Sequence, residues 1–214
     1  MSFILPSIVD ANKPLDKGTR FVNEVITPVD NFFSEYLNIS WKINTIITTS
    51  LPQLIIPEDG VGGRTYASDF VVLAINRENA PKASEMLAHE LAHAVRWGKN
   101  SEWSKDLFCE LVSEGLAVHI EAEFAKTQKD RTFFLKTILA HDDNKNRKIL
   151  KKLERQLKAK NYNYTDIFFG SDKWARWTGY CIGYYIVKRY LEKTGKTIFD
   201  AIGDSYEKFW IYVV

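Results

Sequence analysis

The sequence contains few cysteines, no long apolar run and no excess of either charge. Its 214 residues include only Cys109 and Cys181, which do not form the cysteine-rich framework of a small secreted domain. No segment approaches the roughly 18 uninterrupted apolar residues that a membrane-spanning helix needs. The start, MSFILPSIVD, lacks the basic region and apolar run of a signal peptide. These absences predict a soluble, cytoplasmic protein without a membrane span.

The overall composition is typical of a folded globular protein. Hydrophobic residues make up 45% of the chain, including 13 Phe, 10 Tyr and 6 Trp. The net charge of +2 gives no general reason to expect nucleic acid or an anionic membrane as a partner. We expect one domain over residues 1–214, because a chain of this length can bury one well-packed core.

The N-terminal part predicts one helix and two strands. TPVDNFFSEYL is typical of a helix with Thr27 as its N-cap and Pro28 in its first turn. WKINTIITTS and ASDFVVLAIN, rich in apolar and β-branched residues, predict strands. The intervening EDGVGGRTY predicts a turn, because glycine permits positive φ at Gly60, Gly62 and Gly63.

The pattern then changes to helices. The first is expected from Asn79 to a stop at Gly98, and Ser104 can cap the second. A basic third helix is expected at about 143–160, and a fourth ends at Gly195. Strands followed by helices predict an α+β domain rather than alternating βαβ units.

The segment LAHELAHAVRW places His89 and His93 four residues apart. On a helix these positions share one face, so both imidazoles can reach one zinc ion. The adjacent Glu90 can take a proton from a water molecule on the metal, which suits hydrolysis of an amide. Chance produces this HExxH pattern in roughly one such chain in two hundred, so a third ligand is needed to support it.

The segment CELVSEGLAVHIE supplies three candidates for that ligand: Glu110, Glu114 and Glu121, which share one helical face. A carboxylate row on a half-buried helix is costly unless a cation neutralises it. A solvated acidic face is the alternative interpretation. Together with the histidine pair, the row favours one zinc ion per chain.

HELAH followed by SEGLA resembles the gluzincin metallopeptidases, whose ligand glutamate lies on the helix after the HExxH helix. SEGLAVHIE is similar to a zinc aminopeptidase motif, which implies that Glu114 is the third ligand rather than Glu110. A bacterial family of predicted zinc-dependent proteases, catalogued only as a domain of unknown function, combines a glycine-containing strand, HExxH, an EGLA segment and a late GYxxG segment. GGRTY, HELAH, SEGLA and GYCIG resemble these four parts, so the resemblance implies a strand at GGRTY. The resemblance covers about residues 40–195. It implies a zincin-like fold, with a small N-terminal mixed or antiparallel sheet before a mainly helical portion.

The resemblance also implies roles for individual residues. The zinc ligands would be His89, His93 and Glu114, and Glu90 would be the general base. Glu121 would hold the second ring nitrogen of a histidine ligand, with Glu110 as a competing candidate. Val118 stands where thermolysin-like enzymes have an aspartate, which argues against a close thermolysin relative.

Two further features of such enzymes have candidates here. Zincins line peptides along an edge strand, and ASDFVVLAIN is the suggested one, although its apolar run equally suits a core strand. Tyr180, then Tyr184, are the candidates for stabilising the oxyanion, and packed interface tyrosines explain the pair as well. Arg176 and His119 are outside options, and we expect His119 to point away from the metal.

The remaining residues with possible chemistry have simpler interpretations. NKNRKILKKLERQLKAK is amphipathic, and docking of its leucines on the domain is favoured over contact with RNA or anionic lipid. Cys109 is expected to be inert and His141 to lie in a loop.

The sequence therefore predicts a zinc-dependent peptidase acting on a peptide or protein substrate. An endopeptidase or a narrow-substrate peptidase is slightly favoured, because no exopeptidase motif is recognisable. The alternative is a non-catalytic zincin-fold binding or regulatory protein, and a nucleic-acid-binding protein ranks third. The oligomeric state is not predicted.

Overall fold

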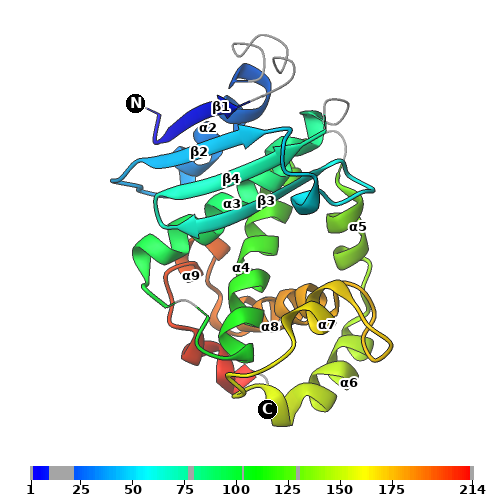
Figure 1. The fold of residues 1–214 in the computed structure, drawn as a ribbon. Coiled ribbons are helices and arrows are strands. Elements are labelled where there is room, and N and C mark those ends of the chain that lie inside the picture. Colours follow the sequence, from blue (N-terminus) through cyan, green and yellow to red (C-terminus); the bar gives the residue numbers. More distant parts are fainter. Residues whose placement is uncertain (1, 10–21, 77–79, 103, 129–130, 213–214) are drawn as a thin grey trace. The chain divides into compact units, whose positions relative to one another are not determined.

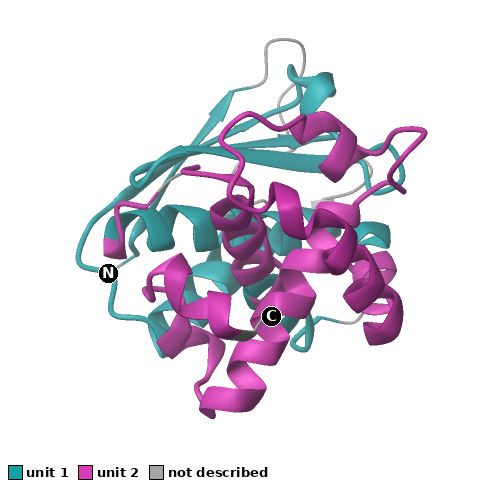
Figure 2. Ribbon diagram, turned by 90° about the horizontal axis from the view of Figure 1, so that it is seen from below, with its two compact units in different colours: residues 1–98, 120–134 teal, residues 99–119, 135–214 magenta. Residues whose placement is uncertain are grey.

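The computed structural model describes residues 2–9, 22–76, 80–102, 104–128 and 131–212 (Figure 1). The chain forms two compact units, one of residues 1–98 and 120–134 and the other of residues 99–119 and 135–214 (Figure 2). A single domain over the whole chain stays a prediction.

The first unit contains a four-stranded mixed sheet, in the order β1-β2-β4-β3. β1 (Ile4–Val9), β2 (Ile43–Thr48) and β4 (Phe70–Ile75) are parallel neighbours, and β3 (Val61–Ala67) runs antiparallel to β4. A mixed N-terminal sheet followed by a mainly helical portion is the zincin-like α+β arrangement that the sequence predicts. The fold class is confirmed.

The position of β4 differs from one prediction. β4 pairs with β2 on one side and with β3 on the other, so ASDFVVLAIN contributes an interior strand and cannot serve as the edge. Five of its six residues are buried, which explains its apolar run. β3 is the edge strand on this side of the sheet.

The glycines before and within β3 have two different roles. Gly60 turns the chain with a φ of 66°, as predicted. Gly62 and Gly63 instead lie within β3, so the prediction that they belong to the turn is wrong, whereas the glycine-containing strand that the family resemblance implied at GGRTY is present. A Cβ on Gly62 would lie 1.8 Å from the carbonyl oxygen of Leu54, and one on Gly63 would lie 2.4 Å from Cγ of Glu90. Both positions need glycine because other atoms approach the strand closely.

Two helix ends of the first unit also differ from the predictions. A π-helical turn, η1 (Val22–Ile26), leads directly into α2 (Thr27–Tyr36), so Thr27 is the first helical residue rather than the N-cap. α3 (Ala80–Lys99) packs on one face of the sheet (Figure 1) and continues through Gly98, where a Cβ would lie 2.3 Å from the Trp41 ring. Asn79, the predicted start, lies outside the described residues. A short 3-10 turn, η2 (Pro52–Leu54), precedes β3.

The helix after α3 is α4 (Leu107–Ala125), whose residues belong partly to each unit. Asp106 rather than Ser104 caps it, since Oδ1 of Asp106 accepts a hydrogen bond from the Cys109 amide at 2.8 Å. The other elements are α5 (Phe133–Leu139), α6 (Asp143–Leu153), η4 (Glu154–Gln156), α7 (Tyr164–Phe169), α8 (Thr178–Thr194), α9 (Ile198–Ala201) and η5 (Tyr206–Tyr212).

Helices of the second unit pack tightly. A Cβ on Gly115 of α4 would lie 2.2 Å from the carbonyl oxygen of Gly183 on α8, so glycine on both helices allows their backbones to touch.

The ends of two further helices can be compared with the predictions. α8 ends at Gly195 as predicted. The basic helix is shorter than predicted and ends at Leu153, with its leucines buried and its lysines exposed. No helix of the described residues is long and apolar enough to span a membrane.

Candidate metal centre

α3 presents the histidine pair from a buried position. Its apolar stripe is buried, namely Leu87, Leu91, Ala94 and Val95, and His89 and His93 are buried beside it. The Nε2 atoms of the two histidines lie 3.3 Å apart. Both rings therefore direct the same nitrogen toward one point, as the four-residue spacing predicts.

His89 is held by two neighbours of the first unit. Its Nδ1 lies 3.0 Å from Oε2 of the fully buried Glu121 on α4, and the ring of Phe134 meets its ring edge to face at 5.9 Å. Burial raises the pKa of Glu121, and the contact with His89 opposes that rise. A carboxylate at Nδ1 selects the tautomer with a proton there, which leaves the Nε2 lone pair for a metal.

Glu121 belongs to a wider buried network. Its Oε1 accepts a hydrogen bond from the Thr132 hydroxyl at 3.4 Å, and the Thr132 amide donates to Oε2 of Glu85 on α3 at 2.9 Å. Burial raises the pKa of Glu85 to about 7. Asp59 accepts hydrogen bonds from the amides of Phe133 and Phe134 and so fixes the start of α5. Residues 132–134 are thus anchored by three buried carboxylates.

Glu90 lies against the edge strand β3. The Thr65 hydroxyl is 2.8 Å from Oε2 of Glu90 and 2.7 Å from its backbone oxygen. Gly63 leaves the space that the Glu90 side chain fills. The carboxylate is therefore oriented by a strand as well as by its own helix.

The histidines and Glu114 form a group of potential ligands. One ligand atom from each of His89, His93 and Glu114 lies within 4.8 Å of the others, and all three residues are buried. On α4, Glu114 is two helical turns before Glu121 and on the same face. Two imidazoles and one carboxylate are the donor set of a catalytic zinc site that keeps a position open for water or substrate. The residues present fit zinc.

Tyr164 contacts Glu114 within the second unit. Its hydroxyl donates a hydrogen bond to Oε1 of Glu114 at 3.1 Å. The pKa of Tyr164 is raised, first by burial and then by the charge of Glu114, so the phenol stays protonated and able to donate. A hydrogen bond also joins it to Tyr180, whose ring meets Phe168 edge to face.

Three other residues that were considered for the site, Tyr184, Arg176 and Glu110, are not members of the ligand group. Tyr184 stacks on His119 with ring centroids 4.0 Å apart, and His119 Nε2 lies 3.1 Å from the Tyr184 carbonyl oxygen. The guanidinium of Arg176 lies over the Trp177 ring. Glu110 is half-buried on α4 and is not part of the ligand group found among the described residues.

The positions of His141 and of the two cysteines agree with the simpler interpretations of these residues. His141 lies in a loop, with Nδ1 2.8 Å from Oδ1 of Asn146. Cys109 and Cys181 are buried free thiols, and burial raises the pKa of Cys181 to about 12.

A family described as "Predicted Zn-dependent protease (DUF2268)" matches residues 20–210, which include every residue of the ligand group. The chain belongs to this family. No curated protein and no solved structure matches the chain.

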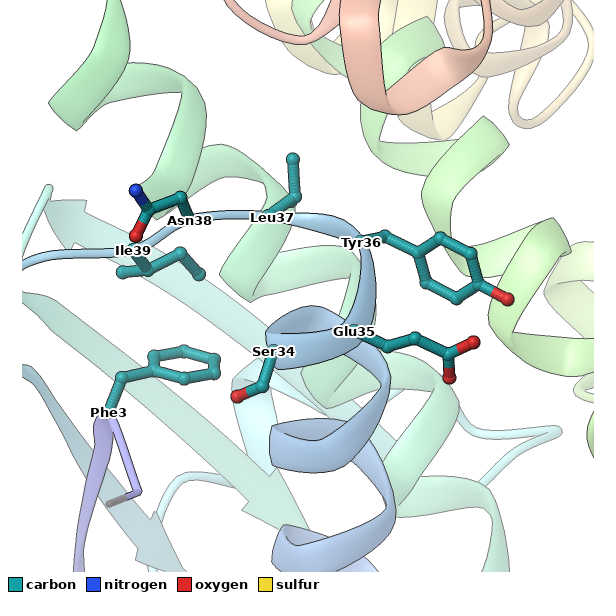
Figure 3. A pocket seen from close by; sticks show the side chains of 7 residues that line it. All are labelled: Phe3, Ser34, Glu35, Tyr36, Leu37, Asn38 and Ile39. Carbon is teal, nitrogen blue, oxygen red and sulfur yellow. The ribbon is translucent and has the colours of Figure 1, made fainter.

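A surface cavity of the first unit involves none of these residues. It has a volume of about 530 Å³ and lies beside the end of α2, between Phe3 and the segment 34–39. In Figure 3, Glu35 and Tyr36 point away from Phe3 and Ile39, so the side chains do not converge on one point. The ligand group remains the candidate site of chemistry.

Three contacts of the candidate site were not predicted from the sequence. They involve Thr65, Thr132 and Tyr164, which touch Glu90, Glu121 and Glu114. Thr65 lies in the GGRTY segment, which gave a weak signal, whereas the other two lie outside every recognised motif.

Proposed function

We propose that this chain is a zinc-dependent peptidase that hydrolyses bonds within a peptide or protein substrate. The observation that carries the proposal is the buried group of His89, His93 and Glu114, with Glu90 on the same helix as the histidines. Membership of a family of predicted zinc-dependent proteases supports it.

The three ligands would hold one zinc ion per chain. Zinc bound there supplies Lewis acidity, which polarises a carbonyl group and lowers the pKa of a water molecule. Glu121 keeps the proton of His89 on Nδ1, and Tyr164 orients the Glu114 carboxylate through Oε1. The contacts favour Glu114 over Glu110 as the third ligand and Glu121 over Glu110 as the partner of the histidine ring nitrogen.

Glu90 acts as the general base. Its carboxylate takes a proton from the attacking water and passes it to the leaving nitrogen of the substrate. Tyr180 is the first candidate for donating to the oxyanion, and its hydroxyl must turn away from Tyr164 to do so, because Tyr164 donates its own hydrogen to Glu114. Tyr184 ranks behind it, because its ring is stacked on His119.

The open edge of β3 supports binding of an extended substrate. The Gly60 carbonyl accepts from the Asn76 amide beside β4, whereas the Val61 carbonyl accepts from the Ile56 amide on the opposite side. In an antiparallel strand this alternation continues, so the main-chain groups of Gly63 and Thr65 face the open edge. A peptide paired there would place its backbone beside Glu90. Because such pairing needs no free terminus, it favours an endopeptidase or a narrow-substrate peptidase.

The first experiment is a measurement of zinc in protein purified without added metal, with His93→Ala as the control. About one zinc per chain in the native protein and a loss in the variant are expected. Absence of zinc, also after reconstitution, would contradict the proposal.

The second experiment tests turnover with a peptide library. Cleavage by the zinc-loaded native chain is expected, and Glu90→Gln should retain zinc while losing cleavage. Normal activity of that variant would exclude Glu90 as the base. A zinc-loaded chain that cuts nothing would favour the non-catalytic zincin-fold alternative.

The cytoplasm remains the proposed location. Two free, buried cysteines in different helices are compatible with a reducing compartment.

A further inference from the structure

We propose that Thr65 is a positioning residue for Glu90: the Thr65 hydroxyl holds Oε2 of the Glu90 carboxylate and leaves Oε1 to act as the base. The inference rests on the proposed function and assigns a role to a residue of the GGRTY segment for which the sequence predicted none.

The contact is buried and has two acceptors. The exposed fractions of Thr65 and Glu90 are 5% and 6%, so bulk water does not replace their hydrogen bonds. The Thr65 oxygen lies 2.8 Å from Oε2 of Glu90 and 2.7 Å from the Glu90 carbonyl oxygen. A hydroxyl has one hydrogen to donate and two lone pairs to accept with, so it can donate to only one of these oxygens at full strength.

The geometry suits the positioning of a general base. The Thr65 hydroxyl donates to Oε2 of the Glu90 carboxylate and so fixes its orientation. Because Oε2 is engaged by Thr65, Oε1 is the oxygen left to take the proton when the water O–H bond breaks. Oε1 then passes that proton to the leaving nitrogen, and Thr65 neither gains nor loses a proton.

Thr65 lies on β3, the strand with which the substrate peptide is proposed to pair. Its main-chain groups face the open edge of β3, while its side chain points to α3 and Glu90. Ordering of β3 by a paired peptide would therefore also order the base. We expect removal of the hydroxyl to affect the chemical step more than substrate binding, because the peptide backbone pairs with main-chain atoms.

The test compares Thr65→Val, which replaces the hydroxyl by a methyl group, with Thr65→Ser, which keeps it. The valine variant should retain zinc and a near-native KM, while kcat falls about 10- to 100-fold through loss of one hydrogen bond to a charged group. The serine variant should stay within about threefold of native kcat. An unchanged kcat in the valine variant, or an equal loss in both variants, would overturn the proposal.

Thr45→Val is a matched control. Thr45 lies in the same cross-strand row, since it pairs with Val71, which pairs with Thr65. Its hydroxyl is buried and makes no hydrogen bond to the described residues. The same substitution there should leave kcat and zinc content unchanged.

A double-mutant cycle for unfolding separates this inference from the proposed function. Thr65→Val should cost more stability in the native background than in Glu90→Ala, because only the native chain retains the buried carboxylate that needs the hydroxyl. Additive effects would show that the contact is absent and overturn the inference. Coupling in a zinc-loaded chain that cuts no peptide would retain the contact but reject the base, and both proposals would then fall.

Discussion

The Nδ1 atom of His89 and the Oε2 atom of Glu121 lie 3.0 Å apart, and both side chains are buried. Because α3 carries the histidine and α4 the glutamate, this pair joins the two helices that supply all three potential ligands. A buried carboxylate at one ring nitrogen increases the basicity of the other, which would strengthen a bond to metal.

Replacement of Glu121 should therefore weaken zinc binding without removing any ligand. We expect Glu121→Ala to lower zinc affinity about 10- to 100-fold, measured by competition with a chelator. Glu123→Ala is the control, because Glu123 is on the same helix and pairs with Lys126 at the surface. Equal affinities in the two variants would show that the contact does not tune the site.

Replacement of Tyr164 should also act on the metal through a ligand. Tyr164→Phe removes the hydrogen bond to Oε1 of Glu114 and keeps the ring that stacks on Phe168. Zinc affinity should fall about tenfold, the lower end of the range for such contacts. Tyr162→Phe, two residues earlier, serves as the control in the same chelator assay. A native affinity in Tyr164→Phe would limit this tyrosine to packing.

An added methyl group at Gly63 should displace the base. The Cβ of alanine would lie 2.4 Å from Cγ of Glu90, so the Glu90 side chain must move. Gly63→Ala should retain zinc and lose at least tenfold in kcat, since catalysis is sensitive to displacements of about 1 Å. At Gly203 the nearest side-chain atom would be 3.5 Å away, so Gly203→Ala should behave as the native chain. Steady-state kinetics with a cleaved library peptide measure both.

Glu85 should make the stability of the chain depend on pH. Burial raises its pKa from 4.5 to about 7, so the folded chain binds one more proton than the unfolded chain between these values. The stabilisation from this proton is present below about pH 4.5 and is lost as the pH rises through about 7; it amounts to about 3 kcal/mol.

Glu85→Gln removes the ionisation and keeps an acceptor for the Thr132 amide. The variant should be more stable than the native chain at pH 8 by up to about 3 kcal/mol, and the difference should shrink toward pH 4.5. Urea unfolding at several pH values measures it. A constant difference across this range would show that Glu85 stays ionised in the folded chain.

Local sequence predicted the features that depend on helix geometry. The spacing of His89 and His93 determines that their rings share a face, and the position of Glu114 followed from a motif on the next helix. The β-branched runs predicted β2 and β4, because strand propensity reflects residues that fit a half-buried pleated surface.

Contacts between distant residues could not be predicted in the same way. Thr65 and Glu90 are 25 residues apart, and Tyr164 and Glu114 are 50 apart, so no periodicity connects them. The strand order was not predicted correctly for a related reason. β1 was not predicted at all, and apolar composition alone does not distinguish an edge strand from an interior one. Gly62 and Gly63 looked like turn residues because close approach and positive φ both select glycine.

The two buried thiols make the chain suitable for site-specific labelling. Cys109 and Cys181 both belong to the second unit, and burial raises the pKa of Cys181 to about 12. Protonated, buried thiols react slowly with maleimides, so a cysteine introduced at the surface can carry a fluorophore with little background. The slow modification of the native thiols in turn reports how often the second unit opens.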